Sequence, residues 1–150
     1  MEPAVFSPIP AGAAVATRVV GLGASAGGLE VLEQFLGNVP PASGLAYVVV
    51  QHLDPNHKAL LVELLQRATA MRVVEAVEAM PVEPNTVYVI PPNTELTMGG
   101  GKLHVAKPVE PRGMRLPIDV LFSSLARELG DRAIGAVLSG MGSDLSLIHI

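Results

Sequence analysis

The 150-residue sequence contains no cysteine and no tryptophan, and only 3% of its residues are aromatic. Without cysteine the chain has no disulfide bond, no thiolate metal ligand and no cysteine nucleophile, which fits a reducing cytoplasm. Charged residues are also sparse at 16%, the net charge is −4, and no run of Lys and Arg is interleaved with aromatic residues. We therefore expect no nucleic acid as a partner.

Neither a secretory signal nor a membrane span is recognisable in the sequence. The N-terminus carries the acidic residue Glu2 and has no basic start, so it does not resemble a signal peptide. No apolar run reaches the roughly 20 residues that a span requires. Hydrophobic residues nevertheless make up 49% of the chain, which predicts a compact domain with its own core. We expect a cytoplasmic protein that does not insert into a membrane.

Short apolar runs alternate with amphipathic segments along the chain. Continuous apolar strands separated by helices are typical of parallel sheets that are covered on both faces. Two further strands flank a triple-glycine turn at residues 99–101 and predict an antiparallel β-hairpin. The sequence thus predicts an α/β fold, a doubly wound and mostly parallel sheet with helices on both faces and a hairpin flank. The expected strands are 18–23, 45–50, 72–74, 87–90, 95–98, 102–105 and 133–138, and the expected helices are 29–39, 57–68 and one from 117.

The segment GLGASAGG, residues 21–28, connects the first strand to the first helix and permits several interpretations. A phosphate-binding loop would need Lys and then Ser or Thr after the last glycine, but Leu29 and Glu30 follow. A loose dinucleotide fingerprint is present, but the second strand ends without the acidic residue that binds ribose. The segment also matches the G-x-S-x-G nucleophile elbow around Ser25, with helix amides available to an oxyanion. A purely structural alternative is that Ser25 caps the helix.

A serine nucleophile needs a base, and the base needs a carboxylate to orient it. His52 follows the second strand and Asp144 follows the last one. Because the carboxyl ends of parallel strands meet at one edge of a sheet, both residues can reach the edge that carries Ser25. His57 and His104 are alternative histidines, which substitution would test against His52.

Five blocks of the sequence, in this order, resemble the catalytic domain of the chemotaxis protein-glutamate methylesterases (CheB-type). The resemblance extends from Thr17 to Asp144. The five blocks together are more specific than any one of them. They are VGLGASAGG at 20–28, VQHL at 50–53, VYVIPP at 87–92, IDVLF at 118–122 and LSGMGSD at 138–144.

The resemblance implies roles for the residues that match these blocks. Ser25 would be the nucleophile, His52 the general base and Asp144 the residue that orients the histidine. Amides near Ala26, Gly27 and Gly28, together with Met141, would shape the oxyanion site. The family hydrolyses γ-glutamyl methyl esters on the cytoplasmic helices of methyl-accepting chemoreceptors and deamidates receptor glutamines. No cofactor and no metal ion is implied.

The resemblance also sets expected domain limits. Residues 1–16, rich in Ala and Pro, are interpreted as a flexible tail too short for the receiver domain that usually precedes this one, and 17–144 as the methylesterase domain. The sequence is closer to the version that opens methylesterase–methyltransferase fusions, which predicts a methyltransferase domain in the full-length chain. Residues 145–150, LSLIHI, replace the glycine and helix that continue the family and are interpreted as an atypical tail of truncated or foreign origin. We expect Asp144 to lie near a frayed end, in a weakly active and poorly soluble chain.

Three alternatives stay open on the sequence alone. Ser25, Asp144 and His149 would form a triad in the order of ordinary α/β-hydrolases. The chain could be a non-catalytic regulatory or docking module that retains the methylesterase fold. It could also be a dinucleotide-binding domain.

Overall fold

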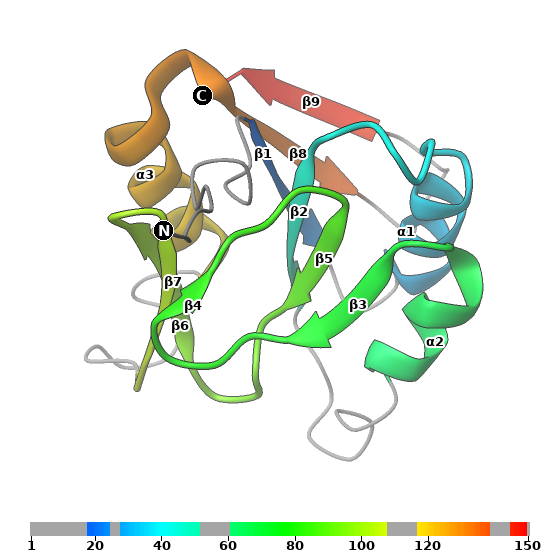
Figure 1. The fold of residues 1–150 in the computed structure, drawn as a ribbon, viewed down its shortest axis with the longest axis horizontal. Helices are drawn as coiled ribbons and strands as arrows, with labels where there is room; N and C mark the ends of the chain where they lie inside the picture. The colour runs from blue at the N-terminus through cyan, green and yellow to red at the C-terminus, as the bar shows by residue number, and fades with distance from the viewer. Residues whose placement is uncertain (1–17, 25–27, 52–60, 108–116, 139–144, 150) are drawn as a thin grey trace, which may run out of the picture.

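The computed structural model describes residues 18–24, 28–51, 61–107, 117–138 and 145–149. Its main feature is a six-stranded sheet with the order β3-β5-β2-β1-β8-β9 (Figure 1). The first five strands in this order are parallel, and β9 is antiparallel to β8. The strands are β1 (Val19–Ala24), β2 (Ala46–Gln51), β3 (Arg72–Glu75), β5 (Thr86–Val89), β8 (Ala133–Leu138) and β9 (Leu145–His149). The expected fold class is confirmed.

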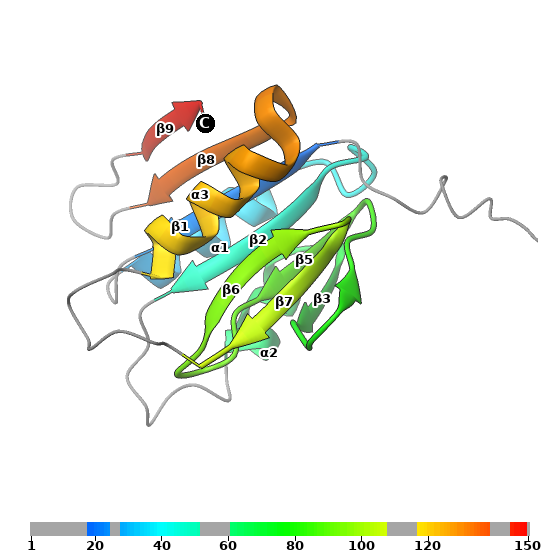
Figure 2. The ribbon, with the colours of Figure 1, turned by 90° about the vertical axis from the view of Figure 1, so that its left-hand side faces the viewer.

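Helices cover both faces of this sheet. Figure 2 shows α3 (Pro117–Leu129) on the face opposite α1 (Leu29–Gly37), and α2 (Leu61–Ala68) packs beside α1. A short 3₁₀ helix, η4 (Gly130–Arg132), connects α3 to β8. The two faces have separate cores, one of them around Leu32, Leu36 and Leu65 and the other around Leu121 and Leu125. Strands buried on both faces explain the unbroken apolar runs in β1 and β2.

The predicted hairpin is confirmed and belongs to a separate small sheet. Strands β6 (Glu95–Gly99) and β7 (Lys102–Ala106) are antiparallel, and the two-residue strand β4 (Met80–Pro81) pairs with β7. The hydroxyl of Ser124 in α3 accepts a 3.0 Å hydrogen bond from Met98 N and donates one to Leu121 O. This buried contact fixes α3 onto the hairpin, so both elements cover the same face of the main sheet.

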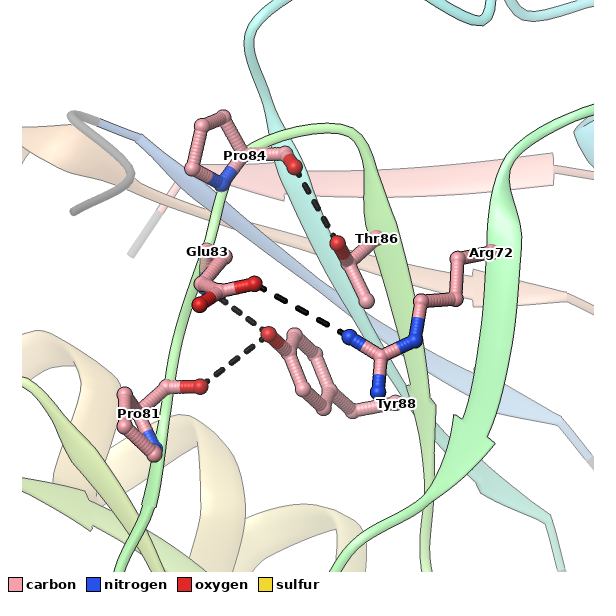
Figure 3. Close-up of polar contacts among 6 residues, drawn as sticks. All are labelled: Arg72, Pro81, Glu83, Pro84, Thr86 and Tyr88. Carbon is pink, nitrogen blue, oxygen red and sulfur yellow. Dashed lines mark hydrogen bonds and ion pairs between the residues drawn. The ribbon is translucent and has the colours of Figure 1, made fainter. Parts of the chain in front are cut away.

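A buried tyrosine holds the connection between β4 and β5. The hydroxyl of Tyr88 donates to Pro81 O at 3.1 Å and accepts from Glu83 N at 2.8 Å (Figure 3). Arg72 Nη1 lies 3.9 Å from Glu83 Oε1, but both side chains are exposed, so this ion pair adds little stability. The burial of Tyr88 raises the pKa of its hydroxyl above the ordinary value of 10.0.

Residues 145–149 form a strand, although the sequence predicts none there and suggests a frayed end. The backbone of β9 pairs with β8 in five register positions, from Leu138↔Leu145 to Ile134↔His149. The physical reason is that β8 would otherwise be an edge strand, whose free N–H and C=O groups readily accept another extended segment.

Candidate active site

The carboxyl ends of three strands meet at one edge of the main sheet. Ala24, the last residue of β1, is in register with Gln51, the last residue of β2, and with Leu138, the last residue of β8. Ser25 directly follows Ala24 in the sequence, and His52 directly follows Gln51. The three strands therefore end side by side, and the segments that contain the predicted catalytic residues follow these ends in the sequence.

The predicted catalytic residues themselves lie outside the residues that the structure describes. This holds for Ser25, His52 and Asp144, and equally for Ala26, Gly27 and Met141. The part of the predicted site that the structure does describe is Gly28 and the strand ends. The geometry of the site therefore rests on the register of these strand ends and on the start of α1.

Gly28 is the N-cap residue of α1, with φ −92° and ψ 5°. It makes no side-chain capping bond, since glycine has no side chain. The amides of the first turn of a helix have no partner within the helix, so here no N-cap side chain accepts from them. The alternative in which Ser25 caps the helix concerns a residue outside the described ranges, and the N-cap of α1 as described is Gly28.

Two glycines of the GLGASAGG segment serve helix packing. Gly21 and Gly23 lie inside β1 and not in the turn that follows it. A Cβ at Gly21 would lie 2.9 Å from Phe122 and Leu125, and one at Gly23 would lie 2.8 Å from Ile118. Cβ atoms essentially never make non-bonded contacts this short, so glycine at both positions allows α3 to pack closely on β1.

This packing contradicts the dinucleotide interpretation. The first glycine of that fingerprint forms the tight turn after the strand, and the second lets the backbone approach a pyrophosphate. Here Gly21 is a strand residue and the space beside Gly23 is filled by Ile118. Strand β2 also ends in Gln51, a buried amide, where the fingerprint needs a carboxylate near the end of this strand.

Of the alternative histidines, His57 lies outside the described residues, and His104 has a different setting. It belongs to β7 in the small sheet, where its Nδ1 lies 3.0 Å from Glu78 Oε2 and its Nε2 lies 3.1 Å from Gly99 O. Hydrogen bonding to Glu78 raises the pKa of His104 above its ordinary value. Both ring nitrogens are occupied, so His104 is a poor candidate for a general base. The sequence did not indicate this pair, because Glu78 and His104 are 26 residues apart.

The register of β9 also argues against His149 as the base. The backbone of His149 pairs with Ile134, near the amino end of β8. Leu138 lies four residues further along β8, at the edge that carries the candidate site, which corresponds to about 13 Å of strand. The triad of Ser25, Asp144 and His149 is therefore not supported.

An apolar groove of about 300 Å³ lies between α1 and the end of β8. The groove is lined by Val31, Gln34, Phe35, Asn38, Val39 and Leu138. None of these side chains is titratable, so this groove offers no acid–base chemistry.

Within the described ranges no group of three or more His, Asp or Glu side chains is placed to hold a metal ion. No described helix is long and apolar enough to cross a bilayer.

The chain matches known proteins over most of its length. The family model described as CheB methylesterase matches residues 20–146. A protein-glutamate methylesterase/protein-glutamine glutaminase of Methanosarcina mazei is 34% identical over 85% of this chain and 37% of its own length. One from Dechloromonas aromatica is 35% identical over 95% of this chain and 41% of its own length. The chain thus spans less than half the length of these relatives.

A solved structure agrees with the sequence matches. The crystal structure of the Thermotoga maritima CheB methylesterase catalytic domain superposes with a TM-score of 0.71 at 27% sequence identity. The superposition covers 85% of this chain and 69% of the other. Because the family model spans more than half of the sequence and the solved fold agrees with it, this chain belongs to the CheB methylesterase family.

Proposed function

We propose that this chain is the catalytic module of a protein-glutamate methylesterase that also deamidates protein glutamines. Its substrates are γ-glutamyl methyl esters on the cytoplasmic helices of chemoreceptors. The observation that supports the proposal is the register of Ala24 with both Gln51 and Leu138, because the segments that contain Ser25, His52 and Asp144 begin after these three strand ends. This arrangement agrees with the general rule that binding and catalytic residues lie at the carboxyl ends of parallel strands.

The proposed reaction is acyl transfer through serine. The Ser25 hydroxyl attacks the ester carbonyl while His52 accepts its proton, and Asp144 orients the imidazole. Protonated His52 then gives its proton to the methoxide leaving group, which departs as methanol. A water molecule hydrolyses the glutamyl-serine ester with His52 again as base. The products are a glutamate carboxylate and free Ser25.

The start of α1 supports the proposed oxyanion site. Gly28, the N-cap residue of α1, has no side chain that could accept hydrogen bonds from the first-turn amides, and the N-terminus of a helix favours a negative charge. We assign this role to the amides around Ala26, Gly27 and Gly28, with Met141 contributing from the segment before Asp144. Loss of one such donor typically slows acyl transfer about 10²–10³-fold.

The proposed setting follows the same resemblance. The catalytic module comprises residues 17–144 and requires no cofactor. Its partners are chemoreceptor helices in the cytoplasm, and a methyltransferase domain is a further partner in a fusion protein. Neither nucleic acid nor membrane insertion is part of the proposal.

Covalent labelling tests the proposal. A serine-directed fluorophosphonate is expected to add one adduct, which peptide mass spectrometry locates at Ser25. Ser25→Ala should remove the adduct, whereas Ser43→Ala, which changes an exposed serine in the loop before β2, should retain it. A folded protein without any adduct would contradict the proposed serine esterase and favour the alternative of a non-catalytic regulatory or docking module.

A further inference from the structure

The small sheet has a weak edge at β4. This strand pairs with β7 through only two positions, Met80↔Leu103 and Pro81↔Lys102. Before Met80 the chain forms a turn in which Met80 N donates to Val77 O at 3.2 Å. Ala79 in this turn has φ +62°, a left-handed conformation that a residue with a Cβ adopts at some cost. Backbone pairing and local preference therefore do little to hold this turn against β7.

The carboxylate of Glu78 compensates for the missing backbone pairing. Its Oε1 accepts a hydrogen bond from Val105 N at 2.8 Å. Val105 is two residues beyond Leu103, so its N–H faces the same edge of β7 that β4 occupies. The Glu78 side chain thus continues the ladder where the β4 backbone has turned away.

The second oxygen of the same carboxylate faces a histidine. Glu78 Oε2 lies 3.0 Å from His104 Nδ1, and His104 Nε2 lies 3.1 Å from Gly99 O. A carboxylate and a carbonyl are both hydrogen-bond acceptors, so each ring nitrogen needs a proton to make its bond. A neutral imidazole carries one N–H and can satisfy only one of the two contacts. The geometry therefore fits the imidazolium form of His104.

The charged groups around His104 shift its pKa in opposite directions. Glu78 raises the pKa of His104 and Lys102 on the same strand opposes this effect, while the bond to His104 lowers the pKa of Glu78. On β6, the register partner of His104 is Thr97, and Glu95 lies on the same face two residues away. The side chains of His104 and Glu78 are 41% and 61% exposed, so solvent limits the strength of their contact.

We propose that Glu78, His104 and Gly99 form a proton-dependent clamp that fastens the turn before β4 to the β6–β7 hairpin. The clamp is closed when His104 is charged and loosens when the imidazole becomes neutral. The pKa of His104 is raised in the folded chain. The charged imidazole therefore contributes its full stabilisation below about pH 6.5, and this stabilisation is lost as the pH rises through the folded-state pKa. Glu78 has a lowered pKa, so its contribution is lost only as the pH falls through a value below 4.5. The clamp is independent of the proposed esterase activity.

Hydrogen exchange and a proton NMR titration test the clamp in the unmodified chain. The His104 resonance should titrate above the ordinary histidine pKa of about 6.5. Exchange protection of the Val105 amide, corrected for intrinsic rates, should fall about two- to fivefold between pH 5.5 and pH 8.5, which corresponds to an exposed ion pair. Glu78→Gln should return the His104 pKa toward the ordinary value, and His104→Gln should abolish the pH dependence at Val105.

Glu128→Gln is the matched control. Glu128 Oε2 accepts a 2.8 Å hydrogen bond from Gly100 N in the same hairpin, and among the described residues no histidine contacts Glu128. This variant should keep the pH response of Val105. Titration of His104 at or below its ordinary pKa, or protection of Val105 that does not change with pH in the unmodified chain, would overturn the clamp.

Discussion

Gly23 lies so close to Ile118 that a Cβ added at position 23 would lie 2.8 to 3.0 Å from three carbon atoms of that isoleucine. The contact joins β1 to α3 across the face of the sheet. One residue after Gly23 the strand ends at Ala24, the register partner of Gln51. The strand that leads to Ser25 is therefore positioned by a helix that begins at Pro117.

Gly23→Ala should destabilise the fold by about 1–3 kcal/mol, the usual effect of overpacking a filled core. The added methyl group meets branched carbons of Ile118, which cannot all move away by a rotation at the tip of the side chain. Chemical denaturation of the purified variant measures the change in the free energy of unfolding.

Two further variants identify the cause. Ile118→Ala removes the carbons that clash, so the double variant should lose less stability than the sum of the two single variants. Gly99→Ala is the matched control, because a Cβ in that strand would meet nothing closer than 3.8 Å. Equal destabilisation by Gly23→Ala and Gly99→Ala would contradict the packing argument.

Tyr88→Phe should reduce the free energy of unfolding by about 1–2 kcal/mol, because it leaves the half-buried groups Pro81 O and Glu83 N without their hydroxyl partner. Tyr47→Phe is the control, since within the described ranges the Tyr47 hydroxyl makes a single polar contact, at 3.5 Å with Ser43. An equal effect of the two variants would refute a special role for the Tyr88 hydroxyl.

The raised pKa of Tyr88 predicts a pH effect of defined sign. Below about pH 10 the hydroxyl is protonated in the folded and unfolded chains, and its contribution to stability is complete. As the pH rises further, the unfolded chain loses this proton first, so stability should fall. Tyr88→Phe should show a smaller fall than the unmodified chain when thermal unfolding is compared at pH 9 and pH 11.

Substitution of three of the four histidines should distinguish the proposed catalytic base from the other two by its effect on ester hydrolysis. His52→Gln should lower ester hydrolysis about 10²–10⁴-fold, the usual contribution of a general base. His104→Gln should retain activity, because His104 contacts Glu78 and Gly99 in the small sheet. His149→Gln should also retain activity, because its backbone pairs with Ile134 at the other end of β8. Loss of turnover in His104→Gln or His149→Gln, with a normal melting temperature, would disprove the assignment of His52.

The main sheet was predictable because burial on both faces leaves a direct trace in sequence. The run of valines at positions 48–50 and the apolar segment that ends at Leu138 both form strands of the parallel sheet. The hairpin was equally readable from its glycine turn, where Gly100 and Gly101 adopt positive φ. Such signals are local, so a single sequence is sufficient to find them.

Features that depend on distant partners were not predictable. The role of Gly21 and Gly23 depends on α3, whose contacting residues lie about a hundred positions later in the chain. Strand β4 is only two residues long and contains Pro81, which normally argues against a strand and is tolerated here at a sheet edge. The pairing of β9 depends on the free edge of β8, which no local pattern encodes.

For the candidate site, the sequence predicted the edge, and the register of Ala24, Gln51 and Leu138 agrees with it. The meeting of Ser25, His52 and Asp144 stays a prediction. These residues follow or precede strands, and the conformation of such connections depends on several elements at once and not on a repeating pattern.

Methanol release from a methylated chemoreceptor fragment tests the central claim most directly. The chain should release methanol, and Ser25→Ala, with an unchanged melting temperature, should release none above the rate of the fragment alone. Equal release by the two proteins, or none by the folded unmodified chain, would contradict the proposed serine mechanism.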